Sequence, residues 1–124
     1  MSFLGVDYGL AKIGLAISEG NLATPLPVLR IKNPGQARQR ILQLIDEHQV
    51  KTVVFGIPHP DSIGAEKFAD ELEEIVKIEL VKVDETLTTK IAGQTSKKKN
   101  EDSAVAANLL QEYLDQEKRN NVAI

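Results

Sequence analysis

The stretch that decides the fold is Phe3-Leu-Gly-Val-Asp7, which runs through Tyr8-Gly9 and soon continues as Lys12-Ile-Gly-Leu-Ala-Ile-Ser18. Both apolar segments are short, and the few residues between them suit a tight turn. They therefore predict a pair of antiparallel strands. Pro25-Leu-Pro-Val-Leu-Arg-Ile31 is a third extended segment, and its prolines favour a position at the edge of the sheet.

Helices and strands alternate in the rest of the chain. Asn33-Pro34 opens a helix, because proline is favoured in a first turn. Thr52–Ile57 is a continuous apolar run, typical of a strand buried on both faces, and Glu79–Val83 reads as a further strand. Three helices are indicated by apolar residues at helical spacing: Ala37, Ile41, Leu44, Ile45 and His48; then Phe68, Leu72, Ile75 and Val76; then Ala106, Leu109, Leu110, Tyr113 and Leu114.

This order of elements predicts one α/β domain over residues 1–124. Its sheet is expected to be mixed and five-stranded, with a three-strand antiparallel meander, two parallel strands and flanking helices. The length of 124 residues suits one hydrophobic core. No internal repeat or linker interrupts the chain.

Composition narrows the classes of function. The chain has no cysteine, which excludes disulfides and cysteine-based zinc sites. No apolar run is long enough for a membrane span, and we expect no membrane partner and no signal peptide. The net charge of −3 disfavours binding to nucleic acid, although Lys97, Lys98 and Lys99 form a basic run. A solvated surface is the simpler interpretation of that run.

Three carboxylates stand at the ends of predicted elements. Asp7 ends an apolar strand, where a buried carboxylate needs a partner or a metal; equally, it could organise the following turn. Glu85 follows Asp84 at the end of the last strand, and Asp84 itself is better explained as a helix N-cap. Asp102 heads the apolar stripe of the last helix, but it could also be an N-cap.

Gathered in one place, three carboxylates would repel one another unless a cation lay between them. Mg²⁺ and Mn²⁺ prefer oxygen ligands and often bind substrate phosphate as well. One or two such ions would suit phosphodiester hydrolysis, in which they activate water and stabilise the leaving oxygen. The spacing of these residues does not by itself show that they converge.

Other candidate residues have simpler explanations. His48 and His59 are better read as packing or surface residues than as ligands. The glycines near the N-terminus do not form a dinucleotide-binding motif. Thr88, with its neighbours Thr86 and Thr89, could bind phosphate, but threonines are common near helix starts.

Four blocks of sequence together resemble the YqgF (RuvX-like) family, and they occur in the family's order over nearly the whole chain. They are Gly5-Val-Asp-Tyr-Gly9 with Lys12-Ile-Gly-Leu-Ala16, Val54-Phe-Gly-Ile-Pro58, Asp84-Glu-Thr-Leu-Thr-Thr89, and Asp102-Ser-Ala-Val-Ala-Ala-Asn-Leu-Leu-Gln111 with Tyr113-Leu114. The resemblance implies an RNase H-like fold related to Holliday junction resolvases. It also implies a cytoplasmic nuclease that matures the 5′ end of 16S ribosomal RNA.

The family's catalytic acids map onto Asp7, Glu85 and Asp102. Lys12 stands where arginine is common, Thr86 replaces another arginine, and the loop after Pro58 is shorter than usual. Lysine keeps the charge of arginine but lacks its planar fork. These departures concern substrate choice and catalytic strength more than the fold.

The leading hypothesis is a metal-dependent endonuclease on structured RNA, with precursor rRNA favoured. Lys12, Thr88 and Lys97–Lys99 would contact phosphate, and Mg²⁺ or Mn²⁺ would be held by the three acids. Cleavage of four-way DNA junctions is the close alternative and would require a homodimer, whereas an RNA nuclease could be a monomer. A non-catalytic RNA-binding or ribosome-assembly module is a second alternative. A sugar-kinase-like nucleotide-binding domain is a third, which the small size of the chain disfavours.

Overall fold

The computed structural model describes residues 2–9, 11–30, 32–58, 61, 63–84 and 101–122, with only the backbone at 101, 102 and 119–122. The central sheet has the strand order β3-β2-β1-β5-β6, and β4 also pairs with β2. β1 is antiparallel to β2 and parallel to β5, and β5 is parallel to β6. The strands are β1 (Ser2–Asp7), β2 (Lys12–Ser18), β3 (Thr24–Pro25), β4 (Leu29–Arg30), β5 (Val50–Ile57) and β6 (Glu79–Asp84).

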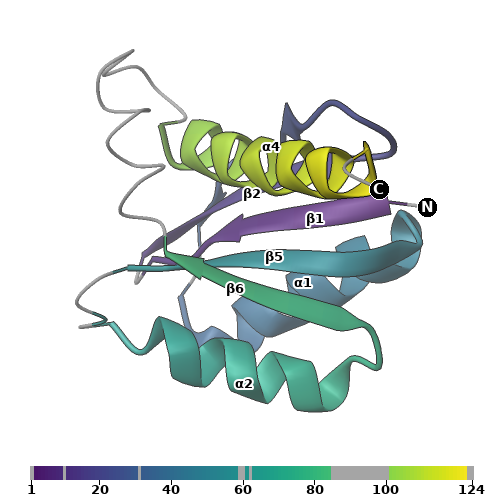
Figure 1. Ribbon diagram of the computed structural model, residues 1–124. Helices are drawn as coiled ribbons and strands as arrows, with labels where there is room; N and C mark the ends of the chain where they lie inside the picture. The colour runs from purple at the N-terminus through teal and green to yellow at the C-terminus, as the bar shows by residue number, and fades with distance from the viewer. Residues whose placement is uncertain are drawn as a thin grey trace.

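Helices cover both faces of this sheet (Figure 1). α1 (Pro34–Glu47) and α2 (Ala65–Ile75) lie on one face, and α4 (Glu101–Val122) lies on the other. Figure 1 also shows that α4 begins on the side of the molecule where β1, β5 and β6 end. No described helix combines the length and the apolar character that crossing a membrane requires.

Two hydrophobic cores follow from this three-layer arrangement. The larger one, on the α1 and α2 face, contains among others Leu4, Val6, Ile13, Leu15, Val53, Phe55, Phe68 and Leu72. The smaller one, under α4, contains Ala16, Val54, Ala106, Leu109, Leu110 and Leu114. Alternate residues of β1 and β5 point to opposite faces, which is why these strands read as continuous apolar runs.

The mixed α/β architecture expected from the sequence is confirmed, with one difference in strand count. The segment Pro25–Ile31, expected to be one edge strand, forms the two short strands β3 and β4. Pro27 lies between them, and proline has no N–H for a strand ladder. β3 pairs Ala16 with Pro25, whereas β4 pairs Ile13 with Leu29. One extra residue on the outer strand is therefore accommodated around Pro27, as in a β-bulge.

The helix starts show how local chemistry fixes these boundaries. α1 begins at Asn33-Pro34 as expected, and Asn33 also caps it, since its Oδ1 accepts a hydrogen bond of 2.8 Å from the Gln36 N–H. Ile75 was among the apolar residues that indicated α2, but its side chain is 50% exposed. Ile75 is the last residue of the helix, where the chain turns and Val76 packs on the core in its place.

Candidate functional site

Asp7 is the last residue of β1 and lies in the middle of the sheet. Its position pairs with Gly14 on the antiparallel neighbour β2 and with Gly56 on the parallel neighbour β5. Directly paired residues of neighbouring strands point to the same face. Both lateral neighbours of the half-buried Asp7 are thus residues without a side chain.

The face on which Asp7 lies follows from strand alternation. Gly5, two residues earlier, packs directly against α4, whereas Val6 belongs to the core on the opposite face. Asp7 therefore points to the α4 side of the sheet. On β6, Val83 pairs with Gly56 and packs on the α4 core. One row of paired residues on this face therefore crosses four strands: Gly14, Asp7, Gly56 and Val83.

Two contacts bring α4 close to the sheet. A Cβ added to Gly5 would lie 2.8 Å from the carbonyl oxygen of Ala106 and 2.9 Å from Cβ of Leu110, so only glycine allows this approach. The hydroxyl of the buried Ser103 accepts a hydrogen bond of 3.4 Å from the Leu15 N–H. Together they place the first turn of α4 near the end of β1 (Figure 1).

This first turn contains Asp102. The helix begins at Glu101, so Asp102 lies within α4 and not at the N-cap position that was considered for it. It precedes the buried Ala106 by four residues, about one helical turn. The backbone of Asp102 thus lies near the end of the sheet at which β1 stops with Asp7. The side chain of Asp102 lies outside the described atoms.

The remaining predicted site residues divide into two groups. Lys12 begins β2 and is exposed on the sheet. Asp84 is the last residue of β6, so Glu85 follows directly on a described strand but itself lies outside the described residues, as do Thr88 and Lys97–Lys99. Within the described parts of the chain, no three histidine, aspartate or glutamate side chains form a metal-binding group. The convergence of the three acids therefore remains a prediction.

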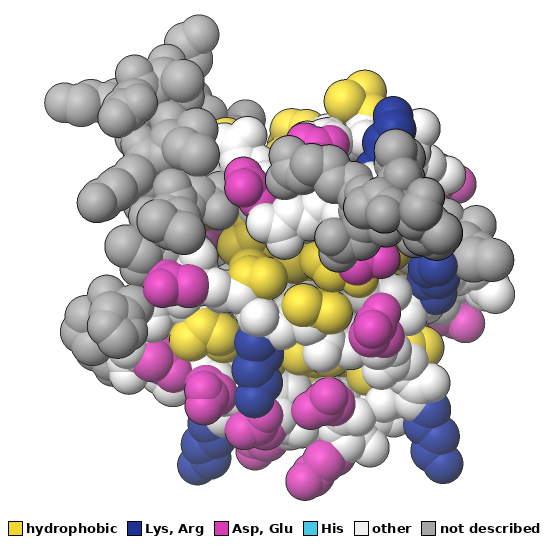
Figure 2. All heavy atoms as spheres, viewed as in Figure 1, with side chains coloured by type: hydrophobic (Ala, Val, Ile, Leu, Met, Phe, Trp, Pro, Cys, Tyr) yellow, Lys and Arg dark blue, Asp and Glu magenta, His cyan; other side chains and the backbone are white. Residues whose placement is uncertain are grey.

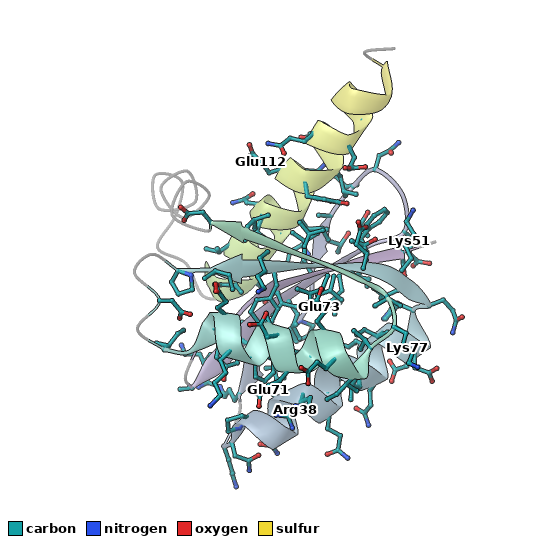
Figure 3. The ribbon with its side chains drawn as sticks, turned by 60° about the horizontal axis from the view of Figure 1, so that its bottom comes forward. Arg38, Lys51, Glu71, Glu73, Lys77 and Glu112 are labelled. Atoms are coloured by element: carbon teal, nitrogen blue, oxygen red, sulfur yellow. The ribbon has the colours of Figure 1, made fainter. Side chains whose placement is uncertain are left out.

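An aromatic cluster supports the end of β1 on the face opposite Asp7. The Tyr8 ring stacks on Phe68 with centroids 4.4 Å apart and lies 6.0 Å from Phe55. Burial raises the pKa of the Tyr8 hydroxyl, and the Glu71 carboxylate adds to the rise while Arg38 opposes it. Arg38 on α1 and Glu71 on α2 form an ion pair of 4.0 Å, and Figure 3 shows them side by side.

Tyr8 was not among the predicted site residues, although it continues the buried alternation of Leu4 and Val6. Asp61 was also missed. Its carboxylate accepts hydrogen bonds of 2.9 Å from the N–H groups of Ala65 and Glu66 at the start of α2, and these bonds lower its pKa. An aspartate a few residues before a predicted helix was the available signal. In this chain the short loop after Pro58 thus ends in a helix cap.

The helices on both faces of the sheet are rich in acidic residues. α2 carries five acidic residues and one lysine. Figure 2 shows acidic side chains gathered over this helix in the lower part of the view. Phosphate-rich ligands are repelled by such a surface. α4, on the face that carries Asp7, also contains five acidic residues, together with two basic ones, so the charge of the helices does not distinguish the two faces.

Comparison with known sequences gives one consistent family. A family model described as "RuvX: Holliday junction resolvase" matches residues 1–116. A protein of Acetivibrio thermocellus named "Putative pre-16S rRNA nuclease" is 38% identical, over 93% of this chain and 96% of its own length. Proteins with the same name from Rickettsia typhi and Halalkalibacterium halodurans are each 34% identical, over 82% and 98% of their own lengths.

Solved structures show the same fold at much lower identity. Thermus thermophilus RuvC in complex with a Holliday junction aligns with 95% of this chain at a TM-score of 0.65 and 12% identity. The fowlpox virus resolvase, also solved with Holliday junction DNA, aligns with 94% at a TM-score of 0.64. The fold is thus RNase H-like, and the match over residues 1–116 together with relatives at 34–38% identity shows that the chain belongs to the RuvX family.

Proposed function

We propose that this protein is a metal-dependent endonuclease that hydrolyses phosphodiester bonds in the 5′-end maturation of 16S precursor rRNA. Its family and the names of its relatives support a nuclease acting on nucleic acid. The structural observation that carries the proposal is the position of Asp7, at the central strand end, between two glycines and beside the first turn of α4. Such maturation would place the protein in the cytoplasm, where ribosomes are assembled.

The proposed acids are Asp7, Glu85 and Asp102. Asp7 and Val83 share a row of the sheet on alternate strands, which lie about 10 Å apart. Glu85 directly follows Asp84, the last residue of β6, and Asp102 is in the turn of α4 near the same end of the sheet. Carboxylates brought in from these three elements would provide the oxygen ligands that Mg²⁺ or Mn²⁺ prefers.

One or two divalent ions bound there would supply an activated water and stabilise the leaving oxygen. The chain's own residues would do the rest. Asp7 holds a negative charge at a fixed point of the rigid central strand. Gly14 and Gly56 place no side chain beside it. Lys12, Thr88 and Lys97–Lys99 are the proposed contacts to flanking phosphates.

Cleavage of four-way DNA junctions is the second candidate. It is favoured by the description of the family and by a fold shared with two Holliday junction resolvases. A junction cut symmetrically needs two active sites, so this candidate requires a homodimer, whereas an RNA nuclease could act as a monomer. The oligomeric state in solution therefore distinguishes them in part.

The test is a cleavage assay with two substrates and two variants. Purified protein is incubated with a 16S precursor fragment or with a four-way DNA junction, in Mg²⁺ or Mn²⁺. Asp7→Asn should reduce cleavage by about 100-fold or more, because it removes a charged ligand. Asp46→Asn is the matched control, since Asp46 is an exposed carboxylate of α1. It should cleave like the wild type.

The outcomes separate the candidates. Cleavage of the RNA alone supports rRNA maturation, and cleavage of the junction alone by a dimer supports the resolvase. Protein that cuts neither substrate, but binds RNA equally well with and without Asp7, would support the non-catalytic binding module and end the nuclease proposal.

A further inference from the structure

Two cations face each other across neighbouring strands on the sheet. Lys12, the first residue of β2, pairs directly with Arg30, the last residue of β4. The next pair is Ile13 with Leu29, and both of these side chains belong to the core on the α1 face. Alternation therefore turns Lys12 and Arg30 to the opposite face, which is also the face of Asp7.

The bulge around Pro27 creates this pairing. β3 pairs Ala16 with Pro25, and a regular continuation of that register would place Leu29 opposite Lys12. The extra residue shifts the register by one, so that Arg30 occupies this place and Leu29 joins the core. Bulges commonly re-aim side chains next to functional sites.

The two cations are close enough to repel each other. Directly opposed residues of antiparallel strands have Cβ atoms about 4.5–5.5 Å apart, and like charges there are destabilising. Both residues are exposed, and within the described structure the ion pairs join other residues: Arg38–Glu71, Arg40–Glu47 and Lys82–Asp70. An anion bound between the two cations would remove the repulsion.

The pair also lies close to Asp7. Asp7 pairs with Gly14, and Lys12 is two residues from Gly14 on the same strand. Such a diagonal neighbour lies about 7–8 Å away. Since Gly14 has no side chain, no side chain of β2 lies between the carboxylate and the two cations. A nucleic-acid strand passing the start of α4 at this end of the sheet would contact both.

We propose that Lys12 and Arg30 form a clamp for one backbone phosphate of the nucleic acid, next to the phosphodiester held at Asp7. The clamp rests on the proposed nuclease function and adds Arg30 to its binding residues. Arg30 would supply the planar fork that suits a phosphate, and Lys12 a point charge beside it. Lys12 stands at a position where arginine is common in the family, and Arg30 would provide an arginine near this position from β4.

The first experiment measures binding of the 16S precursor fragment in EDTA, so that no cleavage occurs, between 50 and 200 mM KCl. Arg30→Gln and Lys12→Gln should each raise Kd about 5- to 10-fold at 100 mM KCl and reduce the slope of log K against log salt by about 1. Arg30→Lys should keep the slope. Lys77→Gln is the charge-matched control and should match the wild type, since Lys77 lies at the opposite end of the molecule (Figure 3).

A second readout needs no nucleic acid. Arg30→Gln should raise Tm by about 1–2 °C at low ionic strength, because it removes the repulsion. It should also reduce the rise in Tm caused by inorganic phosphate. A lower Tm in Arg30→Gln, with an unchanged response to phosphate, would make Arg30 a structural residue and overturn the clamp.

These results separate the clamp from the nuclease proposal. If the wild type binds and cleaves RNA, and Arg30→Gln has the Kd and salt slope of Lys77→Gln, the clamp is wrong and the nuclease proposal stands. If the wild type neither binds nor cleaves RNA or junction DNA, both proposals fail.

Discussion

Replacing Gly5 by alanine should push α4 away from the sheet. The new Cβ would lie 2.8 Å from the Ala106 carbonyl oxygen and 2.9 Å from Cβ of Leu110. Neither atom is the end of a flexible side chain, so the helix itself must shift by several tenths of an ångström. Overpacking of this kind costs about 1–3 kcal/mol. For a domain of this size, about 2 kcal/mol corresponds to a decrease in Tm of about 6–10 °C.

The same displacement should weaken the proposed nuclease activity, because it moves the turn that carries the proposed acid Asp102 relative to Asp7. A shift approaching 1 Å in a catalytic group can reduce the rate about 100-fold. The assays are thermal unfolding and cleavage at a temperature at which the variant remains folded. Gly20→Ala is the matched control, since a Cβ at Gly20 meets no atom within 4 Å. A Tm for Gly5→Ala equal to that of Gly20→Ala would refute the close packing of α4 on β1.

Three further predictions concern other contacts. Ser103→Ala should lower stability to urea by about 1 kcal/mol, because the buried Leu15 N–H loses its acceptor, and should reduce cleavage. Asp61→Asn should flatten the pH dependence of the urea midpoint below about pH 4. The pKa of Asp61 is lowered in the folded protein, so its carboxylate stabilises above its unfolded pKa of 3.8 and this stabilisation is lost as pH falls. Ultraviolet titration should show the pKa of both tyrosines, Tyr8 and Tyr113, above 10.0 in native protein, since burial raises both.

Each of these three predictions has a result that would contradict it. Ser18→Ala, which loses only bonds to the nearby Gly20, is the control for Ser103→Ala and should leave cleavage unchanged. Equal effects of the two variants on cleavage would remove the role given to Ser103. An unaltered pH profile in Asp61→Asn would show that Asp61 does not cap α2. Tyrosines that titrate alike in native and urea-unfolded protein would contradict their burial.

Most of the architecture could be predicted because it depends on local pattern. The continuous apolar run of β5 and the short turn between β1 and β2 require a mixed sheet, and Asn33-Pro34 marks the start of α1. The split of the third segment could not be predicted. Pro27 signals an interruption, but the shift in register depends on which side chains the core accepts, here Leu29.

The candidate site could be predicted only in part, because it depends on which residues the strand pairing brings together. Asp7 could be found because a carboxylate after an apolar strand is conspicuous. Its glycine neighbours, Gly14 and Gly56, acquire meaning only from strand pairing. Arg30 looks like an isolated surface charge until the bulge sets it opposite Lys12. Tyr8 reads as a turn residue beside Gly9, whereas its ring packs in the core.

The most direct test of the central claim, that Asp7 is a metal-binding carboxylate, is the Tm of wild type and Asp7→Asn with and without Mn²⁺. Three acids without a cation repel one another, so Asp7→Asn should have an equal or higher Tm in EDTA. Wild type should be stabilised by Mn²⁺, by about 2.7 kcal/mol at 100 times Kd, and the variant should lose most of this gain. A variant that is less stable in EDTA and still shows the full response to Mn²⁺ would show that Asp7 is not a metal ligand.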